Sequence, residues 1–420
     1  MNYLDCLDYI NSLGMFSKKP GLEKTRYLCG LFDNPQEAYP SIYITGTNGK
    51  GSATAMLANI LAERGNKTGR FISPYIYDFA ERISINNINI PSDDIIRYTK
   101  KIKNMLESVP EDYMPNTFGF ITLIAFLYYR DKSCDIAVIE TGLGGRLDPT
   151  SVIKSPLVSL VMQIGLDHTD ILGDTVEKIA FEECSGAARC PVIIYPNPPS
   201  VIKIAEQTSR ELIIPDLNKL EITSEDISGA EFIYKGDNYK LKLAGRHQIY
   251  NALTVIETAK YIGADYGAIY NGISGTDFPA RLEIISRKPL LIFDGAHNMP
   301  AVCGLRDNIK RLLPGKIILI CGMLKDKQPE HIIKNIAGED FVAKFIAVPV
   351  NNPRAVSASD LRDIASECGA DAEAYADLRV ALAQAMSEAA RDNLAVVAFG
   401  SLYLAGEIKR AYEYLIGCEI

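Results

Sequence analysis

Short apolar runs alternate with longer helix-forming stretches along most of the chain. Runs that are nearly continuous in apolar residues and rich in β-branched side chains, as in strands buried on both faces, occupy residues 41–45, 135–141, 157–164 and 191–195. Between them, residues 52–64 and 121–131 are typical of helices, and Gly65 is placed to end the first of these. This alternation predicts a parallel α/β sheet covered by helices.

The pattern changes twice further along the chain. Residues 215–243 form short polar and β-rich pieces, which predict a small antiparallel sheet, and residues 248–262 predict a helix. A second α/β series follows, with strands expected at residues 289–293, 316–322, 344–350 and 395–400. We therefore expect one domain over residues 1–283 and a smaller one over residues 284–420, joined by a linker at about 274–288.

The stretch "YITGTNGKGS" joins the first predicted strand to the first predicted helix. Gly46, Gly49 and Gly51 let backbone N–H groups approach an anion closely, and the amino end of the helix adds its partial positive charge. Lys50 can reach terminal phosphates, and the hydroxyl of Ser52 can bind Mg²⁺. The spacing differs from the standard Walker pattern, and the alternative is a glycine-rich turn that serves packing alone.

Polar residues follow two of the predicted strands where each strand ends. Glu140 ends one apolar run, and Asp167 and His168 follow the next. Ligands of open α/β sheets bind at the carboxyl ends of the strands, so Glu140, His168 and Ser52 are predicted to hold Mg²⁺ beside a triphosphate. A solvated strand end or a helix cap is the alternative for each residue taken alone.

Three of the four histidines lie in compact polar motifs. His168 lies in "GLDHTD", His247 in "GRHQIYNA" and His297 in "DGAHN", whereas His331 has the surroundings of an ordinary helix residue. A structural role is the usual one for a single histidine. Three such settings in one chain favour a functional site.

Composition narrows the class of protein. The chain has 47% hydrophobic residues, 23% charged residues and a net charge of −8, and it has no strongly basic block that would bind nucleic acid. Its nine cysteines form no C-x-x-C pair, which is typical of a reducing compartment. The first residues lack the basic region of a signal peptide, and no apolar run has membrane-spanning length. We therefore expect a cytoplasmic protein without a membrane or nucleic-acid partner.

Several motifs, taken in order, resemble those of the folylpolyglutamate synthase and dihydrofolate synthase family, a branch of the Mur ligase superfamily. They are "GTNGKGS", "FISPYIYDFAERISIN", "VIETGLGGRLDPTSVI", "IGLDHTDILGDT", "GRHQIYNA", "FPARLE", "DGAHN", "DKQ", "PRA" and "GSLYLAGEI". The resemblance extends over about residues 21–409. It implies an α/β fold with an N-terminal P-loop-containing, Mur-ligase-like domain that carries the small antiparallel sheet, and a smaller C-terminal Rossmann-like domain.

The resemblance also implies an activity. Members of this family use ATP to phosphorylate the carboxylate of a folate or of dihydropteroate, and the amine of L-glutamate then displaces phosphate from the acyl phosphate. The implied cofactors are ATP and Mg²⁺, with K⁺ as a further candidate ion. The implied partners are these small molecules, and a monomer is expected because similar proteins are commonly monomers.

The family motifs assign roles to matching residues. The expected phosphate-binding residues are Thr47, Asn48, Gly49, Lys50, Gly51 and Ser52, and the other expected ATP-binding residues are Asn251, Arg281 and Asp294. The expected metal ligands are Ser52, Glu140 and His168, and the expected substrate-binding residues are Ser73, Arg82, His297 and Ser401. Lys50, Glu140, His168 and His297 are the expected catalytic residues. A linker salt bridge is the alternative for Arg281.

The chain departs from the family pattern at several positions. The family usually has a carbamylated lysine in a motif that reads "FEECSG" here, and its position falls on Glu183 or, with one inserted residue, on Cys184. We expect Glu183 to supply the negative charge directly at a metal site, and a solvated helix glutamate is the alternative. Tyr75 replaces a frequent histidine, Gly119 a frequent glutamate and Ala280 the usual glycine, while "HNMP" replaces "HNP".

Two alternatives remain open from the sequence. One is a Mur-type amide ligase for another acid, although the phosphate loop begins at residue 46 and leaves little room for a preceding sugar-binding domain. The other is a nucleotide-binding homologue with weakened catalysis, which the missing lysine suggests. The residues do not distinguish dihydropteroate from tetrahydrofolate substrates, and they do not set the length of a polyglutamate product.

Overall fold

The computed structural model describes residues 1–14 and 21–417. They form two compact units. The first unit comprises Met1–Glu221, Phe232–Lys242 and Gln248–Thr276, and the second comprises Ile222–Glu231, Leu243–His247 and the chain from Asp277 onward.

The first unit is built on a sheet whose strand order is β4-β3-β2-β5-β1-β6-β7-β8. The strands are β1 (Ser41–Thr45), β2 (Thr68–Phe71), β3 (Ile83–Ile85), β4 (Ile88–Asn89), β5 (Ile136–Glu140), β6 (Val158–Val161), β7 (Val192–Ile194) and β8 (Leu212–Ile213). The pairs from β2 to β8 are parallel, whereas β3 and β4 add an antiparallel edge. All five residues of β1 and of β5 are buried, as continuous apolar runs predict.

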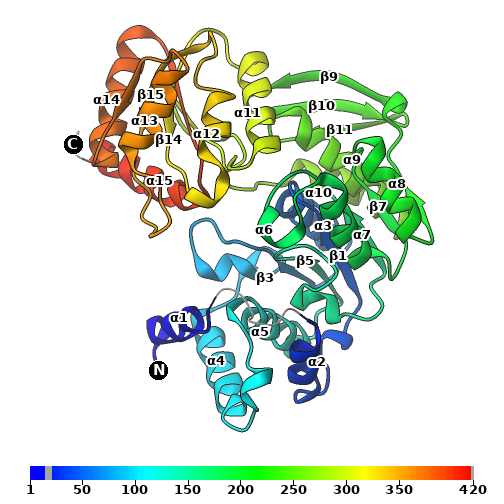
Figure 1. Ribbon diagram of the computed structural model, residues 1–420. Helices are drawn as coiled ribbons and strands as arrows, with labels where there is room; N and C mark the ends of the chain where they lie inside the picture. Colours follow the sequence, from blue (N-terminus) through cyan, green and yellow to red (C-terminus); the bar gives the residue numbers. More distant parts are fainter. Residues whose placement is uncertain (15–20, 418–420) are drawn as a thin grey trace. The chain divides into compact units, whose positions relative to one another are not determined.

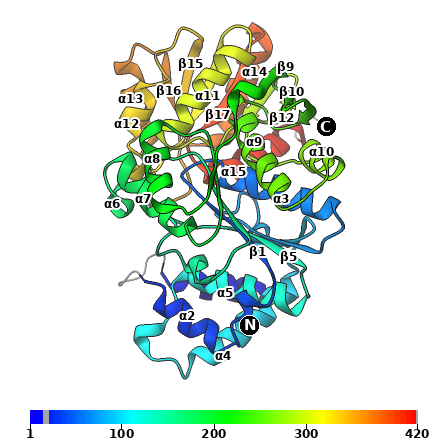
Figure 2. The same ribbon diagram turned by 90° about the vertical axis from the view of Figure 1, so that its right-hand side faces the viewer.

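Helices cover this sheet, and Figures 1 and 2 show α3 and α5 on opposite sides of β1 and β5. The helices are α1 (Tyr3–Ser12), α2 (Glu23–Gly30), α3 (Lys50–Glu63), α4 (Ser92–Leu106), α5 (Thr117–Asp131), α6 (Thr169–Leu172), α7 (Val176–Ala187), α8 (Pro199–Thr208), α9 (Arg246–Tyr261) and α10 (Tyr266–Ser274). Every residue of α5 from Gly119 to Tyr129 is buried, which explains its apolar sequence. Helix α4 is amphipathic and buries Ile95, Tyr98, Ile102 and Leu106 at helical spacing.

A three-stranded sheet in the order β11-β10-β9 follows in the chain. Its strands are β9 (Leu220–Asp226), β10 (Gly229–Tyr234) and β11 (Asp237–Leu241). Only two residues join each strand to the next, a connection that links antiparallel neighbours. Lys235 and Gly236, which join β10 to β11, both have positive φ angles, 52° and 88°, as a type I′ turn requires. The small antiparallel sheet predicted for residues 215–243 is confirmed.

The second unit has a sheet in the order β12-β13-β17-β14-β15-β16, in which all neighbouring strands are parallel except β12 and β13. The strands are β12 (Glu283–Arg287), β13 (Leu290–Phe293), β14 (Ile317–Cys321), β15 (Val342–Ala347), β16 (Ala372–Ala374) and β17 (Ala395–Phe399). The helices are α11 (Met299–Leu312), α12 (Pro329–Lys334), α13 (Ala358–Glu367), α14 (Leu378–Asp392) and α15 (Leu402–Gly417). The predicted α/β class is thus confirmed.

Some elements differ from the prediction. Helix α3 begins at Lys50, two residues before the expected start, because Gly49 takes a left-handed conformation and ends the loop. The antiparallel edge formed by β3 and β4 was not predicted, because these strands are short and polar on one side. No helix among residues 1–14 and 21–417 is both long and apolar enough to cross a bilayer.

The close approach of α10 to α3 gives a stability prediction. A Cβ atom on Gly272 would lie 2.5 Å from Cγ1 of Ile60 and 2.6 Å from its backbone, so Gly272→Ala must push the helices apart. Such overpacking costs about 1–3 kcal/mol, and we expect urea unfolding of the variant to shift accordingly. Gly30→Ala is the control, because nothing lies within 4 Å of its added Cβ. Equal stability of the two variants would contradict the packing described here.

Candidate functional site

The loop between β1 and α3 has the backbone of a phosphate loop. Gly46 and Gly49 have φ angles of 130° and 88°, which side-chain-bearing residues rarely adopt. A Cβ on Gly49 would lie 2.5 Å from Oδ1 of Asn251, so the side chain of Asn251 packs directly on the loop. Asn251 is buried, and its Nδ2 donates to Oε1 of Gln248 at 3.0 Å. The structure therefore brings Asn251 to the predicted phosphate site.

Protein groups hold this loop from two sides. The Glu183 carboxylate accepts hydrogen bonds from the hydroxyl of Thr45 and from the backbone N–H of Gly46, the latter at 3.0 Å. On the other side, the carbonyl oxygen of Gln163 accepts from the N–H groups of Thr47 and Asn48 at 2.9 and 3.1 Å. The N–H groups of residues 46–48 are therefore used within the protein.

The part of the loop that could meet an anion is consequently the first turn of α3. Residues 49–52 carry the N–H groups that an α-helix leaves without intrahelical partners. Lys50 Nζ donates to the carbonyl oxygens of Gly46 and Thr47 in this structure. Ser52 is buried, and its hydroxyl has no hydrogen-bond partner in the described structure. This placement differs from the expectation that Gly46 presents its own N–H to the phosphate.

Glu140 lies at the end of β5, beside the loop. It pairs in register with Ile44 on β1 and is only 3% exposed. His168 takes a left-handed conformation before α6, and its side chain is 40% exposed. In the chain as described, no group of three or more His, Cys, Asp or Glu residues is arranged to hold a metal ion. Mg²⁺ usually takes only one or two carboxylates together with water and substrate phosphates, so Glu140 and the buried hydroxyl of Ser52 fit that ion.

Glu183 lies in α7 and is 2% exposed, so the alternative of a solvated helix glutamate is wrong. Burial raises the pKa of its carboxyl group, while Lys50 and the two hydrogen bonds from the loop act in the opposite direction. Helix α7 can lie this close to the loop because Gly186 packs directly on Gly145. A Cβ on Gly186 would lie 2.3 Å from the Gly145 carbonyl carbon, so a larger residue would not fit there. Of the two positions that can match the family lysine, Glu183 is thus one whose carboxylate contacts the loop.

Asp148 shapes the glycine-rich turn that follows Glu140, a role that the sequence analysis missed. Its Oδ2 accepts from the N–H groups of Gly142 and Leu143 at 3.0 and 3.1 Å, and its Oδ1 accepts from the N–H of Thr150 at 2.9 Å. Burial raises the pKa of Asp148 to about 6. An aspartate before Pro-Thr is a signal for such a turn, and it was available in the sequence.

Ser73 and Arg82 lie in the segment between β2 and β3. Ser73 follows β2, whose Phe71 pairs with Ile139 of β5, so Ser73 is placed near the edge that carries Glu140. Arg82 ends a short 3₁₀ helix, η2 (Phe79–Arg82), and its guanidinium carbon lies 5.1 Å from the centre of the Tyr75 ring. The two predicted substrate residues therefore belong to one loop at the carboxyl edge of the first sheet.

Three predicted residues of the second unit meet at the carboxyl ends of β13 and β17. Asp294 follows β13, and its two carboxylate oxygens accept from the N–H groups of Leu282 and Ala296 at 2.9 and 2.8 Å. His297 Nδ1 lies 2.7 Å from the Gly295 carbonyl oxygen, and Ser401 is buried just after β17. A hydrogen bond from the N–H of Gly400 to the Ala296 carbonyl joins the two loops.

Arg281 lies between two residues of unusual backbone conformation. Ala280 and Leu282 have φ angles of 56° and 46°, which explains why glycine is the usual residue at the first of them. The Arg281 side chain donates to the Ala280 carbonyl at 2.9 Å and lies over the Phe278 ring. Burial raises the pKa of Asp294, and the charge of Arg281 opposes that shift, so the two side chains are electrostatic neighbours.

His247 belongs to a polar cluster of the second unit that the site prediction did not include. Its Nδ1 lies 3.2 Å from Nδ2 of Asn308, and Arg311 donates to Asn308 Oδ1 and pairs with Glu225. Loss of solvent and the positive charges of Arg281 and Arg311 lower the pKa of His247 to about 4. The imidazole is therefore neutral at physiological pH, with Asn308 as donor to Nδ1.

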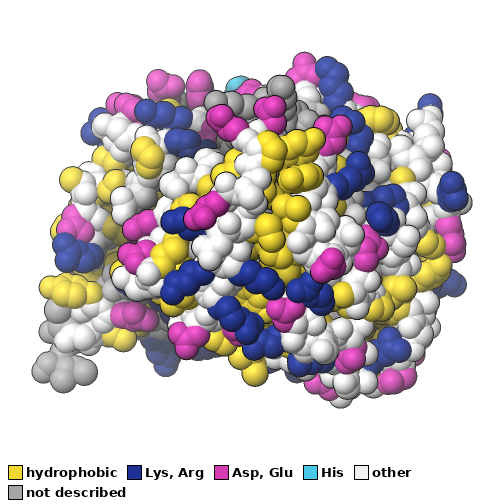
Figure 3. All heavy atoms as spheres, turned by 90° about the horizontal axis from the view of Figure 1, so that it is seen from below, with side chains coloured by type: hydrophobic (Ala, Val, Ile, Leu, Met, Phe, Trp, Pro, Cys, Tyr) yellow, Lys and Arg dark blue, Asp and Glu magenta, His cyan; other side chains and the backbone are white. Residues whose placement is uncertain are grey.

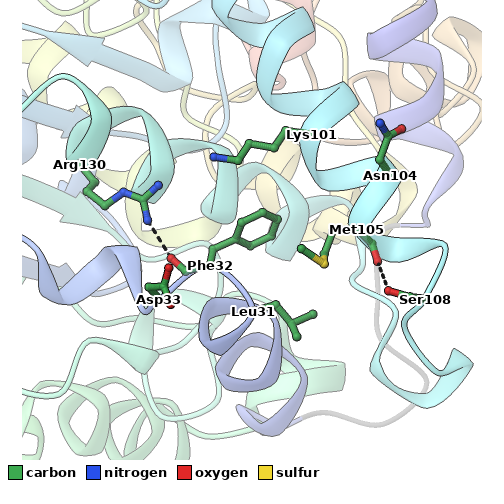
Figure 4. A pocket seen from close by; sticks show the side chains of 8 residues that line it. All are labelled: Leu31, Phe32, Asp33, Lys101, Asn104, Met105, Ser108 and Arg130. Atoms are coloured by element: carbon green, nitrogen blue, oxygen red, sulfur yellow. Dashed lines mark hydrogen bonds between the residues drawn. The ribbon is translucent and has the colours of Figure 1, made fainter.

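A pocket of about 600 Å³ lies elsewhere in the first unit and is lined by residues of α4, of α5 and of the segment after α2. Figure 4 shows Lys101 and Met105 next to the Phe32 ring, with Arg130 on the side opposite Met105. None of the predicted site residues lines this pocket. Figure 3, which views the molecule from below, shows hydrophobic side chains bordered by Lys and Arg side chains. This pocket is therefore separate from the predicted chemistry.

Comparisons with known proteins agree with this geometry. Residues 44–259 match the Mur ligase middle domain, and residues 280–402 match the Mur ligase glutamate ligase domain. A Bacillus subtilis protein named dihydrofolate synthase/folylpolyglutamate synthase is 30% identical over 97% of this chain and 98% of its own. The Mycobacterium tuberculosis folylpolyglutamate synthase complexed with ADP and AMPPCP is 27% identical, with a TM-score of 0.86 and 99% of each chain covered. A folylpolyglutamate synthase complex with AMPPCP and folate is 28% identical, with a TM-score of 0.83, and the match covers 98% of this chain and all of that one.

Glu183 gives a prediction that separates activity from stability. Glu183→Gln removes a buried charge whose desolvation is unfavourable, so we expect the melting temperature to stay unchanged or rise. The loop loses a charge-assisted hydrogen bond, and kcat/KM for ATP is expected to fall about tenfold or more. Glu182→Gln is the control, since Glu182 pairs with Arg146 at the surface. A fall in melting temperature with unchanged turnover would contradict this role.

The lowered pKa of His247 predicts that the protein loses stability in acid. Its pKa falls from an ordinary 6.5 to about 4 on folding, so the unfolded chain binds the proton more readily. Above about pH 6.5 the titration of His247 therefore takes nothing from the free energy of unfolding. As the pH falls towards 4, that free energy decreases by at most about 3 kcal/mol through this group. Urea unfolding of the wild type and of His247→Gln at pH 7 and pH 4.5 measures this decrease. The pH dependence should be smaller in the variant, and equal pH dependence would refute the assignment.

Proposed function

We propose that this chain, which belongs to the Mur ligase family, joins L-glutamate to the carboxylate of a folate or of dihydropteroate and consumes ATP in doing so. The family makes it an ATP-dependent ligase. The folate and dihydrofolate synthase branch is supported by relatives that match almost the whole chain. The observation that carries the proposal is the first turn of α3, which carries Lys50 and the buried Ser52 hydroxyl and follows β1, while Glu140 ends the neighbouring strand β5.

The chemistry explains why ATP is needed. A carboxylate and an ammonium group do not condense by themselves, because the oxygen that must leave is a poor leaving group. Transfer of the γ-phosphoryl group to the carboxylate creates an acyl phosphate, and the glutamate amine then displaces phosphate. The N–H groups of residues 49–52 and the Lys50 ammonium bind the phosphates and stabilise the charge on the phosphoryl group in transit.

Mg²⁺ fits the oxygen ligands on the first unit. Ser52 and Glu140 would hold it, His168 is the third proposed ligand, and the ion would neutralise charge at the phosphates. K⁺ is a further candidate ion. We propose that Glu183 acts on the loop through Thr45 and Gly46 and provides a fixed negative charge near Lys50, so that turnover needs no CO₂.

The other site residues receive roles from their family motifs. Asn251, Arg281 and Asp294 are proposed to bind ATP, and Ser73, Arg82, His297 and Ser401 to bind the acid substrate and glutamate. The proposal for Asn251 is supported by its packing on Gly49, and that for Asp294 by its position after β13. We further propose that the protein works as a monomer in the cytoplasm, which size-exclusion chromatography and cell fractionation would test.

Turnover of the wild-type protein tests the proposed function. We expect phosphate release from ATP only when dihydropteroate, dihydrofolate or tetrahydrofolate and L-glutamate are all supplied, and mass analysis should find the acid plus one glutamate residue. Comparing the three acids decides which substrate is accepted. Release that needs another acid in place of a pterin would favour a different Mur-type ligase, and release without any acid would contradict ligation.

Lys50→Ala should lower kcat about a hundredfold or more, because a charge that stabilises the transferring phosphoryl group is removed. The control is Lys203→Ala, an exposed lysine of α8. Similar rates for both variants would show that Lys50 does not act on the phosphates.

A further inference from the structure

Helix α7 packs beside strand β1 and is attached to it at two points (Figure 1). At the first point the Glu183 carboxylate accepts hydrogen bonds from Thr45 and Gly46. The second point involves Tyr43, which precedes Thr45 by two residues and therefore points to the same side of the strand. Tyr43 is fully buried, and its hydroxyl contacts the glycine-rich turn that follows Glu140. This turn packs on α7 in its own right.

The carbonyl oxygen of Gly145 lies at the centre of the second attachment. It accepts a hydrogen bond from the Tyr43 hydroxyl at 3.1 Å and another from the hydroxyl of Ser151. The two hydroxyl oxygens are themselves 2.6 Å apart. Burial raises the pKa of Tyr43, so the phenol keeps its proton and remains a donor. Tyr43 and Ser151 therefore fix the position of one peptide group of the turn.

That peptide group lies directly on the backbone of α7. A Cβ added to Gly145 would lie 2.7 Å from the carbonyl oxygen of Glu183. The N–H of Arg146, the next residue, donates to the carbonyl oxygen of Glu182 at 3.0 Å. The turn of α7 that carries Glu183 therefore cannot shift without moving Gly145.

Arg189 ties the far end of α7 to the same place. It lies two residues after the helix ends, and it donates to the carbonyl oxygens of Ser151 and Ile153, the latter at 2.5 Å. Its guanidinium carbon lies 5.1 Å from the centre of the Tyr43 ring. Ser151 belongs to the short 3₁₀ helix η4 (Pro149–Val152). Both ends of the Glu183 helix segment are thus referred to Tyr43 and η4.

We infer that Tyr43 and Ser151 are positioning residues, which hold the Glu183 carboxylate on the phosphate loop by fixing the Gly145 carbonyl. The inference rests on the proposed function, which gives this loop its role in ATP binding. Because Tyr43 and Thr45 lie on one strand, a shift of Gly145 relative to Tyr43 moves Glu183 relative to Thr45. Positioning groups must be held to a fraction of an ångström, and buried hydrogen bonds provide that. Neither hydroxyl takes part in bond making.

Removal of the two hydroxyl groups tests the inference. Tyr43→Phe and Ser151→Ala each leave the Gly145 oxygen with one donor, so both variants should fold. We expect kcat/KM for ATP to fall about threefold in each and about tenfold in the double variant. The matched control is Tyr129→Phe, which should keep the wild-type value. Tyr129 is a buried tyrosine of the same unit, but its hydroxyl donates to a carbonyl of β2 at 2.5 Å.

A double-mutant cycle with Glu183→Gln separates positioning from a purely structural role. If the hydroxyls act through the Glu183 carboxylate, their removal should lower kcat/KM less than about threefold in the Glu183→Gln background, while its effect on the melting temperature stays the same. Equal losses of activity in both backgrounds, or no loss in the wild-type background, would overturn the inference. The single variants give the same cycle if the double variant unfolds.

Calorimetric titration with Mg²⁺ and AMPPCP, without acid or glutamate, measures the same cycle on nucleotide affinity. Because this titration needs no turnover, it decides the inference separately from the reaction. If the wild type binds AMPPCP but shows no pterin-dependent turnover, the proposed function fails while the positioning of Glu183 is still tested.

Discussion

The phosphate loop depends on being held from both sides by groups that do not belong to it. The Glu183 carboxylate of α7 holds the start of the loop through Thr45 and Gly46, and the Gln163 carbonyl after β6 holds its middle. These bonds use the N–H groups of residues 46–48 and leave the first turn of α3 to meet an anion. A buried carboxylate is unfavourable by itself, so Lys50 and the loop bonds must offset part of its desolvation.

This constraint connects several features of the first unit. Gly145 and Gly186 let α7 approach, and Asp148 shapes the glycine-rich turn after Glu140. The parallel order of β2, β5, β1 and β6 brings their loops to one edge. The second unit uses the same principle, with Asp294, His297 and Ser401 after neighbouring parallel strands. In both units the chemistry follows from where parallel strands end.

Much of this arrangement follows from the sequence, for physical reasons. β1 and β5 were predicted because strands buried on both faces are apolar throughout, and the phosphate loop was predicted because few other turns need those glycines beside a lysine. The edge pair β3 and β4 is too short to give a pattern. Gln163 contacts the loop through its backbone carbonyl, which every residue has. The residue type at position 163 therefore could not reveal this contact. Glu183 was noticed only as a departure, and its burial against Thr45 depends on a close helix approach that spacing does not show.

In the proposed reaction, an organic acid receives the γ-phosphoryl group of ATP before glutamate attacks. Turnover with a pterin-linked acid whose carboxylate carries ¹⁸O tests this directly, with the released phosphate analysed by mass spectrometry. If an acyl phosphate forms, one ¹⁸O atom appears in each phosphate released. Phosphate that contains no ¹⁸O while the amide product forms would rule out the acyl phosphate and with it the proposed reaction.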